Sequence, residues 1–254
     1  MRLHKTACVG ALTALAMSGC GGGSDPAPAS TPSSSGSAEG IWNGTTDTSR
    51  TIAGIVLDDG TYYVIYASPG SSAGPSGVIQ GNGTSNNGNF SSSNTRDFNL
   101  EGLGVLSATV SANSSARQSF NGSINYADPS VGSVSFTSTY DTRYDATPNL
   151  NALAGTYTGD VASSAGSESA SVTVASNGSF TGSGASGCTF TGTAIPRSSG
   201  NIFNISISFA AAPCVLPNTT VSGVAFFDEA SGDLIATAPN SSRTDGVLFI
   251  GTKT

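Results

Sequence analysis

The stretch Phe203-Asn204-Ile205-Ser206-Ile207-Ser208-Phe209 decides the fold class of this chain. Apolar and polar side chains alternate along it, which is the period of a β-strand with one buried face and one wet face. The same period runs from residue 39 to the end and is broken by turns rich in Gly, Asn and Asp. Because no stretch carries a helical period, the sequence predicts an all-β protein.

Outward from this strand, short strands follow one another at regular spacing. In the C-terminal half they are expected near 155–161, 168–175, 179–185, 188–194, 202–209, 220–227, 233–238 and 246–252. About eight antiparallel strands joined in sequence by tight turns suit an up-and-down barrel, which leaves no strand edge free.

The chain also repeats itself at an offset of about 111 to 118 residues, as duplication followed by loop drift would produce. The matching pairs are Gly40-Ile41-Trp42-Asn43-Gly44 with Gly155-Thr156-Tyr157-Thr158-Gly159, the turns Asp59-Gly60 with Asn177-Gly178, and Ile79-Gln80-Gly81 with Phe190-Thr191-Gly192. Asp-Gly and Asn-Gly are strong hairpin signals. We therefore predict two tandem antiparallel up-and-down β-barrels of about eight strands each, over residues 39–147 and 148–254. The junction at 147–152 is short and polar, so the two barrels are expected to unfold independently.

The first 19 residues have a basic start, an apolar run and small residues before Cys20, which is the pattern of a secretory signal peptide. Met17-Ser18-Gly19-Cys20 resembles the bacterial lipobox, and this resemblance implies cleavage before Cys20 and lipidation of that cysteine. An ordinary signal that happens to end at a cysteine is the alternative. Several acyl chains would give stable anchoring. Gly21, in place of an aspartate, implies the outer membrane by the sorting rule of enteric bacteria.

Residues 20–38 are predicted to form the lipidated cysteine and a disordered tether. This segment is rich in Gly, Ser, Pro and Ala and carries one charge and no large apolar side chain. Such a composition cannot bury enough apolar surface to fold.

The charge balance excludes nucleic acid as a partner. The chain has 16 acidic and 9 basic residues, and Arg2 and Lys5 lie in the leader, which leaves a formal charge of −9 without it. A chain this acidic repels phosphate backbones. The one histidine, His4, also lies in the leader, so the remaining chain has none.

Four features of the sequence are candidates for chemistry. Gly70-Ser71-Ser72-Ala73-Gly74 fits the Gly-x-Ser-x-Gly pattern of hydrolases, but it lacks a strand-to-helix context and a histidine base. The acid pairs Asp58-Asp59 and Asp228-Glu229 lie on predicted tight turns and not across a cleft. The turn 228–233 lacks the ligand spacing of a calcium loop. We therefore predict no enzymatic activity, no metal and no cofactor.

Cys188 and Cys214 are an even pair in an oxidising compartment, so a disulfide is expected between them. The alternative, a two-thiol redox or metal site, lacks both Cys-x-x-Cys spacing and a histidine. A bridge would close a loop of about 26 residues and contribute about 3 to 4 kcal/mol.

Several stretches together resemble uncharacterised proteobacterial outer-membrane lipoproteins with tandem small β-barrels. They are the Gly-x-Tyr-x-Gly start at 155–159, Gly187-Cys188-Thr189-Phe190-Thr191-Gly192, the Cys214 loop and Ser242-Arg243-Thr244-Asp245-Gly246. The architecture is also loosely similar to the barrels of transferrin-binding-type surface lipoproteins, whose loops bind host proteins. These resemblances bring no known activity to this chain.

Trp42 and Tyr157 resemble the aromatic residue in the Gly-x-Trp start of lipocalin-like barrels. In those barrels the aromatic ring closes one end and a late arginine packs over it, and Arg143 and Arg243 fall late in their units. These four residues are therefore expected to close the barrel ends.

Taken together, the sequence predicts a non-enzymatic outer-membrane lipoprotein, held to the membrane by the lipid on Cys20, on either its periplasmic or its surface face. The leading expectation is a structural or interaction role at the cell envelope, with a protein or glycan partner. The alternative is a calycin-like carrier of a small apolar ligand, which requires a barrel cavity of about 300 Å³ or more lined by apolar side chains. A solidly packed interior would eliminate that alternative.

Overall fold

The computed structural model describes residues 37–71 and 74–254, and these are almost entirely β-strand. The predicted signal peptide, Cys20 and most of the tether lie outside the described residues, as do two residues of the Gly70–Gly74 motif. Within the described part of the chain, no helix has the length and apolar character needed to cross a membrane.

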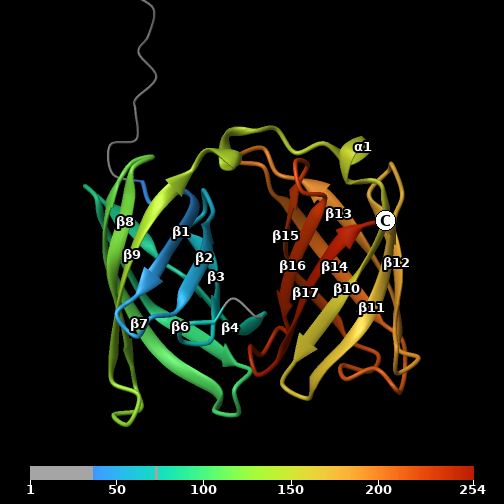
Figure 1. Cartoon of the computed structure of the whole chain (residues 1–254), viewed down its shortest axis with the longest axis horizontal. Coiled ribbons are helices and arrows are strands. Elements are labelled where there is room, and N and C mark those ends of the chain that lie inside the picture. Colours follow the sequence, from blue (N-terminus) through green and yellow to red (C-terminus); the bar gives the residue numbers. More distant parts are fainter. Residues whose placement is uncertain (1–36, 72–73) are drawn as a thin grey trace, which may run out of the picture. The chain divides into compact units, whose positions relative to one another are not determined.

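The first barrel is built from eight strands in chain order (Figure 1, blue to green). They are β1 (Gly40–Thr46), β2 (Thr51–Val56), β3 (Thr61–Ala67), β4 (Pro75–Asn82), β6 (Asn89–Asn99), β7 (Gly104–Ser115), β8 (Ser119–Tyr126) and β9 (Ser133–Asp141). Each strand is antiparallel to its neighbour, and pairing of β1 with β9 and of β4 with β6 closes the ring. The short strand β5 (Thr84–Asn86) forms a hairpin with β6.

The second barrel also closes antiparallel, with β10 paired to β17 (Figure 1, yellow to red). Its strands are β10 (Gly155–Ser163), β11 (Gly166–Val174), β12 (Ser179–Gly184), β13 (Thr189–Pro196), β14 (Phe203–Phe209), β15 (Thr220–Asp228), β16 (Asp233–Pro239) and β17 (Gly246–Lys253). All eight strands expected from the alternation are present within a few residues. The predicted fold class, two eight-stranded antiparallel barrels, is confirmed.

The repeated start of each unit makes the same local contact in both barrels. The Trp42 indole Nε1–H donates to the Ala38 carbonyl at 2.8 Å, and the Tyr157 hydroxyl donates to the Leu153 carbonyl at 2.5 Å. In each case an aromatic side chain in the first strand bonds the backbone four residues upstream. Ala38, which composition assigns to the tether, is fully buried, because its carbonyl is the acceptor at this end of the first barrel.

The two halves also share a glycine beneath an aromatic ring. A Cβ added to Gly81 on β4 would lie 2.3 Å from the Tyr62 hydroxyl, and one added to Gly192 on β13 would lie 2.2 Å from the Phe180 ring. Only glycine lets these rings lie flat over the neighbouring strand. The matched pairs of the sequence thus occupy equivalent positions in the two barrels.

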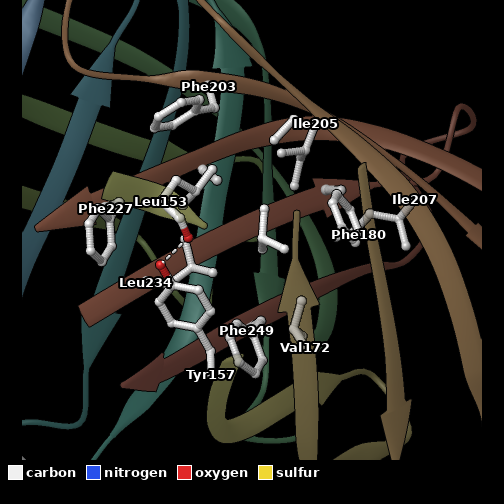
Figure 2. Packing of buried hydrophobic residues seen from close by; sticks show 14 of the residues in the cluster. Leu153, Tyr157, Val172, Phe180, Phe203, Ile205, Ile207, Phe227, Leu234 and Phe249 are labelled. Atoms are coloured by element: carbon white, nitrogen blue, oxygen red, sulfur yellow. Dashed lines mark hydrogen bonds between the residues drawn. The ribbon is translucent and has the colours of Figure 1, made fainter. Parts of the chain in front are cut away.

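The core of the second barrel is filled by large side chains (Figure 2). Phe203, Ile205 and Ile207 of the alternating stretch all point inward and are at most 7 % exposed. The short helix α1 (Leu150–Leu153) precedes β10, and its Leu153 is packed into the same cluster. Figure 2 shows Leu153 against Tyr157, with the hydrogen bond between them.

A further buried cluster contains residues from both barrels. Its members are Ile41, Leu57, Tyr63, Tyr144, Ile202, Val224 and Phe226. Tyr144 belongs to the 3-10 turn η1 (Thr142–Asp145) that follows β9, and its carbonyl accepts from the Asn201 backbone N–H at 2.9 Å. The expectation that the barrels unfold independently rests only on the junction at 147–152, and this shared apolar cluster is a contact that the junction does not reveal.

Candidate binding cavity in the first barrel

The interiors of the two barrels differ in volume. The first barrel contains a cavity of about 370 Å³. In the second barrel about 60 Å³ is free among the core side chains, and a further hollow of about 280 Å³ lies beside Cys188 at one end of the barrel. Ser138 of β9 is one of the small inward side chains that line the cavity of the first barrel.

One end of the cavity is closed by aromatic rings. Trp42 is 2 % exposed and lies 5.6 Å from Phe120 and 5.4 Å from Tyr140, centroid to centroid. Phe120 also packs on Phe90 and Phe136. This aromatic floor gives a ligand an apolar surface to lie against.

The cavity extends to the opposite end of the barrel, which we call the mouth. One residue from each of four loops lines it there: Thr48, Pro69, Leu103 and Val131. Leu103 is 60 % exposed, an unusual position for a large apolar side chain.

A buried carboxylate lies in the cavity wall on the mouth side. Asp97 of β6 is 2 % exposed, and its Oδ1 and Oδ2 accept from the hydroxyls of Tyr66 at 2.9 Å and Tyr126 at 2.7 Å. The Asn99 side-chain amide donates to the Tyr66 hydroxyl at 3.1 Å. Strands β3, β6 and β8 therefore contribute to one polar cluster in an otherwise apolar interior.

Burial raises the pKa of Asp97, and the hydrogen bonds from Tyr126 and Tyr66 and the charge of Arg50 offset this only in part. Burial likewise raises the pKa of Tyr66 and of Tyr126, with the neighbouring Asp97 charge acting in the same direction. Both tyrosines are therefore neutral donors to the carboxylate at physiological pH.

Arg50 lies beside this cluster, but its charge is already paired. Its guanidinium donates to both carboxylate oxygens of Glu101, at 3.2 and 2.7 Å, and to the Ala67 carbonyl at 3.0 Å. It also stacks over the Tyr66 ring with 5.2 Å to the centroid. A fork-to-fork pair of this kind fixes the arginine at the mouth.

Deeper in the wall a second polar group is satisfied internally. The Tyr62 hydroxyl lies 2.6 Å from Thr95 Oγ1 and donates to Ser92 Oγ at 3.1 Å. Ser92 in turn donates to the Asn82 carbonyl at 2.8 Å. These buried hydroxyls therefore already have hydrogen-bond partners within the protein.

The structure places the predicted arginines at contacts between the barrels. Arg143 Nη1 donates to Asp228 at 2.5 Å, and its guanidinium lies over the Phe226 ring at 5.5 Å. Arg243 Nη2 donates to the Gln80 carbonyl of β4 at 2.7 Å, and burial lowers the pKa of Arg243. Each of the two arginines therefore contacts the barrel to which it does not belong.

Other cations lie near the predicted aromatic residues. Lys253 Nζ is 6.0 Å from the Tyr157 centroid and donates to the Ala152 carbonyl at 2.6 Å. Arg117 lies 5.8 Å from the centroid of Tyr140, the ring next to Trp42.

The remaining candidates have structural partners. Cys188 and Cys214 form the predicted disulfide. Arg197 pairs with Asp58 and, at 3.2 Å, with Asp59, so this acid pair contacts the other barrel. No cluster of three or more side chains able to hold a metal occurs in the described ranges 37–71 and 74–254.

Sequence reasoning missed Asp97 because the strand changes register. β6 shifts its pairing with β7 between Ser92 and Thr95, so Thr95, Asp97 and Asn99 face inward. The default assignment would bury the neighbouring Phe98 and expose the aspartate. The Ser-Ser-Ser-Asn run at 91–94 is the sequence signal that could have indicated a bulge.

No protein-family model and no curated protein matches the chain. Among solved structures, two crystal structures of the vaccine antigen transferrin binding protein B from Haemophilus parasuis Hp5 match, one a double mutant and one a single mutant. Their identities to this chain are 13 % and 12 %, and the TM-scores are 0.30 and 0.26. Each match covers 81 % of this chain and 51 % of the other, so this chain spans about half the length of those solved chains.

Proposed function

We propose that this chain is a non-enzymatic binding protein of the bacterial cell envelope and that its first barrel carries a small, mainly apolar ligand. The observation that carries this proposal is the 370 Å³ cavity, since small-molecule sites begin at about 300 Å³ and are lined mostly by apolar and aromatic side chains. The cavity volume therefore exceeds the minimum of about 300 Å³ that a carrier of a small apolar ligand requires.

The second barrel is a useful comparison, because its core is densely packed although it has the same fold and the same starting motif. Its core retains about 60 Å³, too little for such a ligand, and the hollow of about 280 Å³ beside Cys188 lies at the end of the barrel and not among the core side chains. The core of the first barrel therefore contains more free volume than the core of the second. The second barrel supports the first through the shared cluster and the arginine contacts.

The envelope location belongs to this proposal and rests on the sequence of the first 38 residues. The signal pattern and the lipobox at Cys20 support a lipid anchor in the outer membrane, and the Gly/Ser/Pro/Ala composition supports a tether between lipid and barrels. A protein held at a lipid surface meets small amphiphiles at high local concentration.

Binding can be tested with decanol, a neutral probe with an apolar tail. Trp42, the only tryptophan, lines the cavity, so its fluorescence reports occupancy directly. We expect a saturable change with one equivalent bound, and heat of binding in calorimetry at the same stoichiometry. The variant Val110→Phe places a ring in the cavity from β7 and should weaken both signals while keeping its β-sheet circular dichroism. Absence of saturable binding to the native chain would refute the carrier function.

A further inference from the structure

The Asp97 carboxylate has unused capacity to accept hydrogen bonds. A carboxylate offers about four lone-pair positions, and the Tyr66 and Tyr126 hydroxyls occupy two of them. Because Asp97 is 2 % exposed, bulk water has little access to the other two. Its side chain lines the cavity, and Arg50 is the other charged residue that does so in the described part of the chain.

The negative charge of Asp97 is offset only by the charge of Arg50, which is itself paired with Glu101. Among the residues that the structure describes, no basic side chain forms an ion pair with Asp97. The nearest candidate, Arg50, is committed to Glu101 and to the Ala67 carbonyl. A buried carboxylate without a cation is costly, so the cavity wall is preorganised to receive positive charge.

From this geometry we infer that the ligand of the first barrel is an amphiphile with a protonated amine at one end, which binds Asp97. The inference rests on the proposed carrier function and adds the chemistry of the head group. The apolar body would extend from the mouth side toward the aromatic floor at Trp42, and the ammonium group would donate to the free carboxylate positions. Recognition of a cation by a fixed, desolvated carboxylate gives strong charge-assisted hydrogen bonds.

The long-range field acts in the same direction. The full chain carries 16 acidic and 9 basic residues, a formal charge of −7. Such a field attracts cationic ligands and repels anionic ones such as fatty acids. An anionic head group would have to displace Glu101 from Arg50 and would meet the Asp97 charge.

Decylamine, decanol and decanoic acid share the same ten-carbon chain and differ only in the head group. Each is titrated into the full chain at neutral pH, below its micelle concentration. Binding is followed by Trp42 fluorescence. We expect decylamine to bind at least tenfold more tightly than decanol, and decanoic acid to bind most weakly. Equal affinities for all three would overturn the amine inference and leave the carrier function standing. Tightest binding of decanoic acid would overturn it in favour of Arg50. No binding of any probe would refute the carrier function itself.

The variant Asp97→Asn keeps the shape of the wall and removes its charge. It should lose the preference for decylamine by tenfold or more and bind decanol as the native chain does. Asp128→Asn is the matched control, because Asp128 is an exposed carboxylate in the loop between β8 and β9 at the same end. It should leave all three affinities unchanged. Retained amine preference in Asp97→Asn would contradict the inference.

A pH titration of the native chain gives an independent measurement if Asp97→Asn does not fold. The charged and titratable groups around Asp97 are Tyr66, Tyr126, Arg50 and Glu101. Decylamine affinity should fall as Asp97 is protonated at acidic pH, while decanol affinity stays constant over the same range. Constant decylamine affinity over that range, or an equal loss of both affinities, would contradict the role of Asp97.

Discussion

The Tyr66 hydroxyl donates to Oδ1 of Asp97 at 2.9 Å inside the wall of the first barrel, where Asp97 is 2 % exposed. A carboxylate in such a place lowers stability at neutral pH unless something compensates for its lost hydration. The proposed ligand provides that compensation, and several consequences can be measured without the ligand.

The stability of the native chain should depend on the protonation of Asp97. Its pKa is raised in the folded protein, so the folded state binds more protons than the unfolded state between the ordinary and the raised pKa. Its contribution to stability is therefore greatest at low pH and is lost as the pH rises through the folded value. Relative to Asp97→Asn, the native chain should lose stability from about pH 4 upward. Urea unfolding of both proteins across pH checks this, and a difference that does not change with pH would contradict it.

Carboxylates with lowered pKa values produce the opposite slope and serve as the internal reference. The hydrogen bond from Arg143 lowers the pKa of Asp141, and that from Arg50 lowers the pKa of Glu101. Both contribute stability that is present above their unfolded pKa and lost as the pH falls. Asp141 is common to the native chain and Asp97→Asn, so its contribution cancels in the difference, whereas Glu101 interacts with Asp97 and cancels only in part.

The two barrels should respond differently to an added ring. Val110→Phe places a ring in the 370 Å³ cavity and should change stability by less than about 1 kcal/mol. Val172→Phe makes the same substitution in the second barrel, where only about 60 Å³ is free, and should cost about 1 to 3 kcal/mol. Denaturant unfolding of both variants measures the comparison. Equal destabilisation would mean that the first interior is as full as the second.

Arg143 should couple the barrels. It pairs with Asp228 and lies over Phe226, while its own backbone follows β9 of the first barrel. Its side chain is 45 % exposed, so Arg143→Gln should cost only about 1 kcal/mol in total stability. The larger effect should be a separation of the two thermal transitions in calorimetry. Arg117→Gln is the control, since Arg117 pairs with Asp145 at 2.9 Å and contacts Tyr140, and it should leave the transitions together.

Removing the disulfide should affect both barrels, but unequally. The Cys188–Cys214 bond closes a loop of 26 residues and contributes about 3 to 4 kcal/mol to the second barrel. The double Cys→Ser variant should lower the transition of that barrel by at least about 10 °C. The Trp42 fluorescence transition should fall by a smaller amount, because Ile41 and Tyr63 share a buried cluster with Val224 and Phe226. An unchanged Trp42 transition would show that the barrels are uncoupled.

The period of two along the chain was sufficient to predict the strands, because inward and outward positions of a barrel alternate strictly. Phe203, Ile205 and Ile207 illustrate this: their alternation with polar residues predicted β14, and all three lie in the core. The Asp59-Gly60 and Asn177-Gly178 turns were predictable for a similar reason, since their local hydrogen bonds need no distant partner.

The site could not be predicted in the same way, because it depends on volumes and on register. The cavity is lined by residues from strands that are far apart in sequence. Asp97 faces inward only because β6 shifts register before Thr95. The position of Arg143 and Arg243 in the repeat predicts that they close the barrel ends, whereas their partners, Asp228 and the Gln80 carbonyl, belong to the opposite barrel. The internal repeat predicts what the two barrels have in common, but it does not predict which residues of one barrel contact the other.

Methyl NMR during titration with decanol tests the central claim, that the first barrel binds a ligand and the second does not. Ile52, Ile79 and Ile124 line the cavity of the first barrel, and Ile205 and Ile207 lie in the core of the second. We predict that the first group shifts and saturates at one equivalent of decanol while the second group stays in place. Shifts of equal size in both groups, or none in the first, would contradict the account.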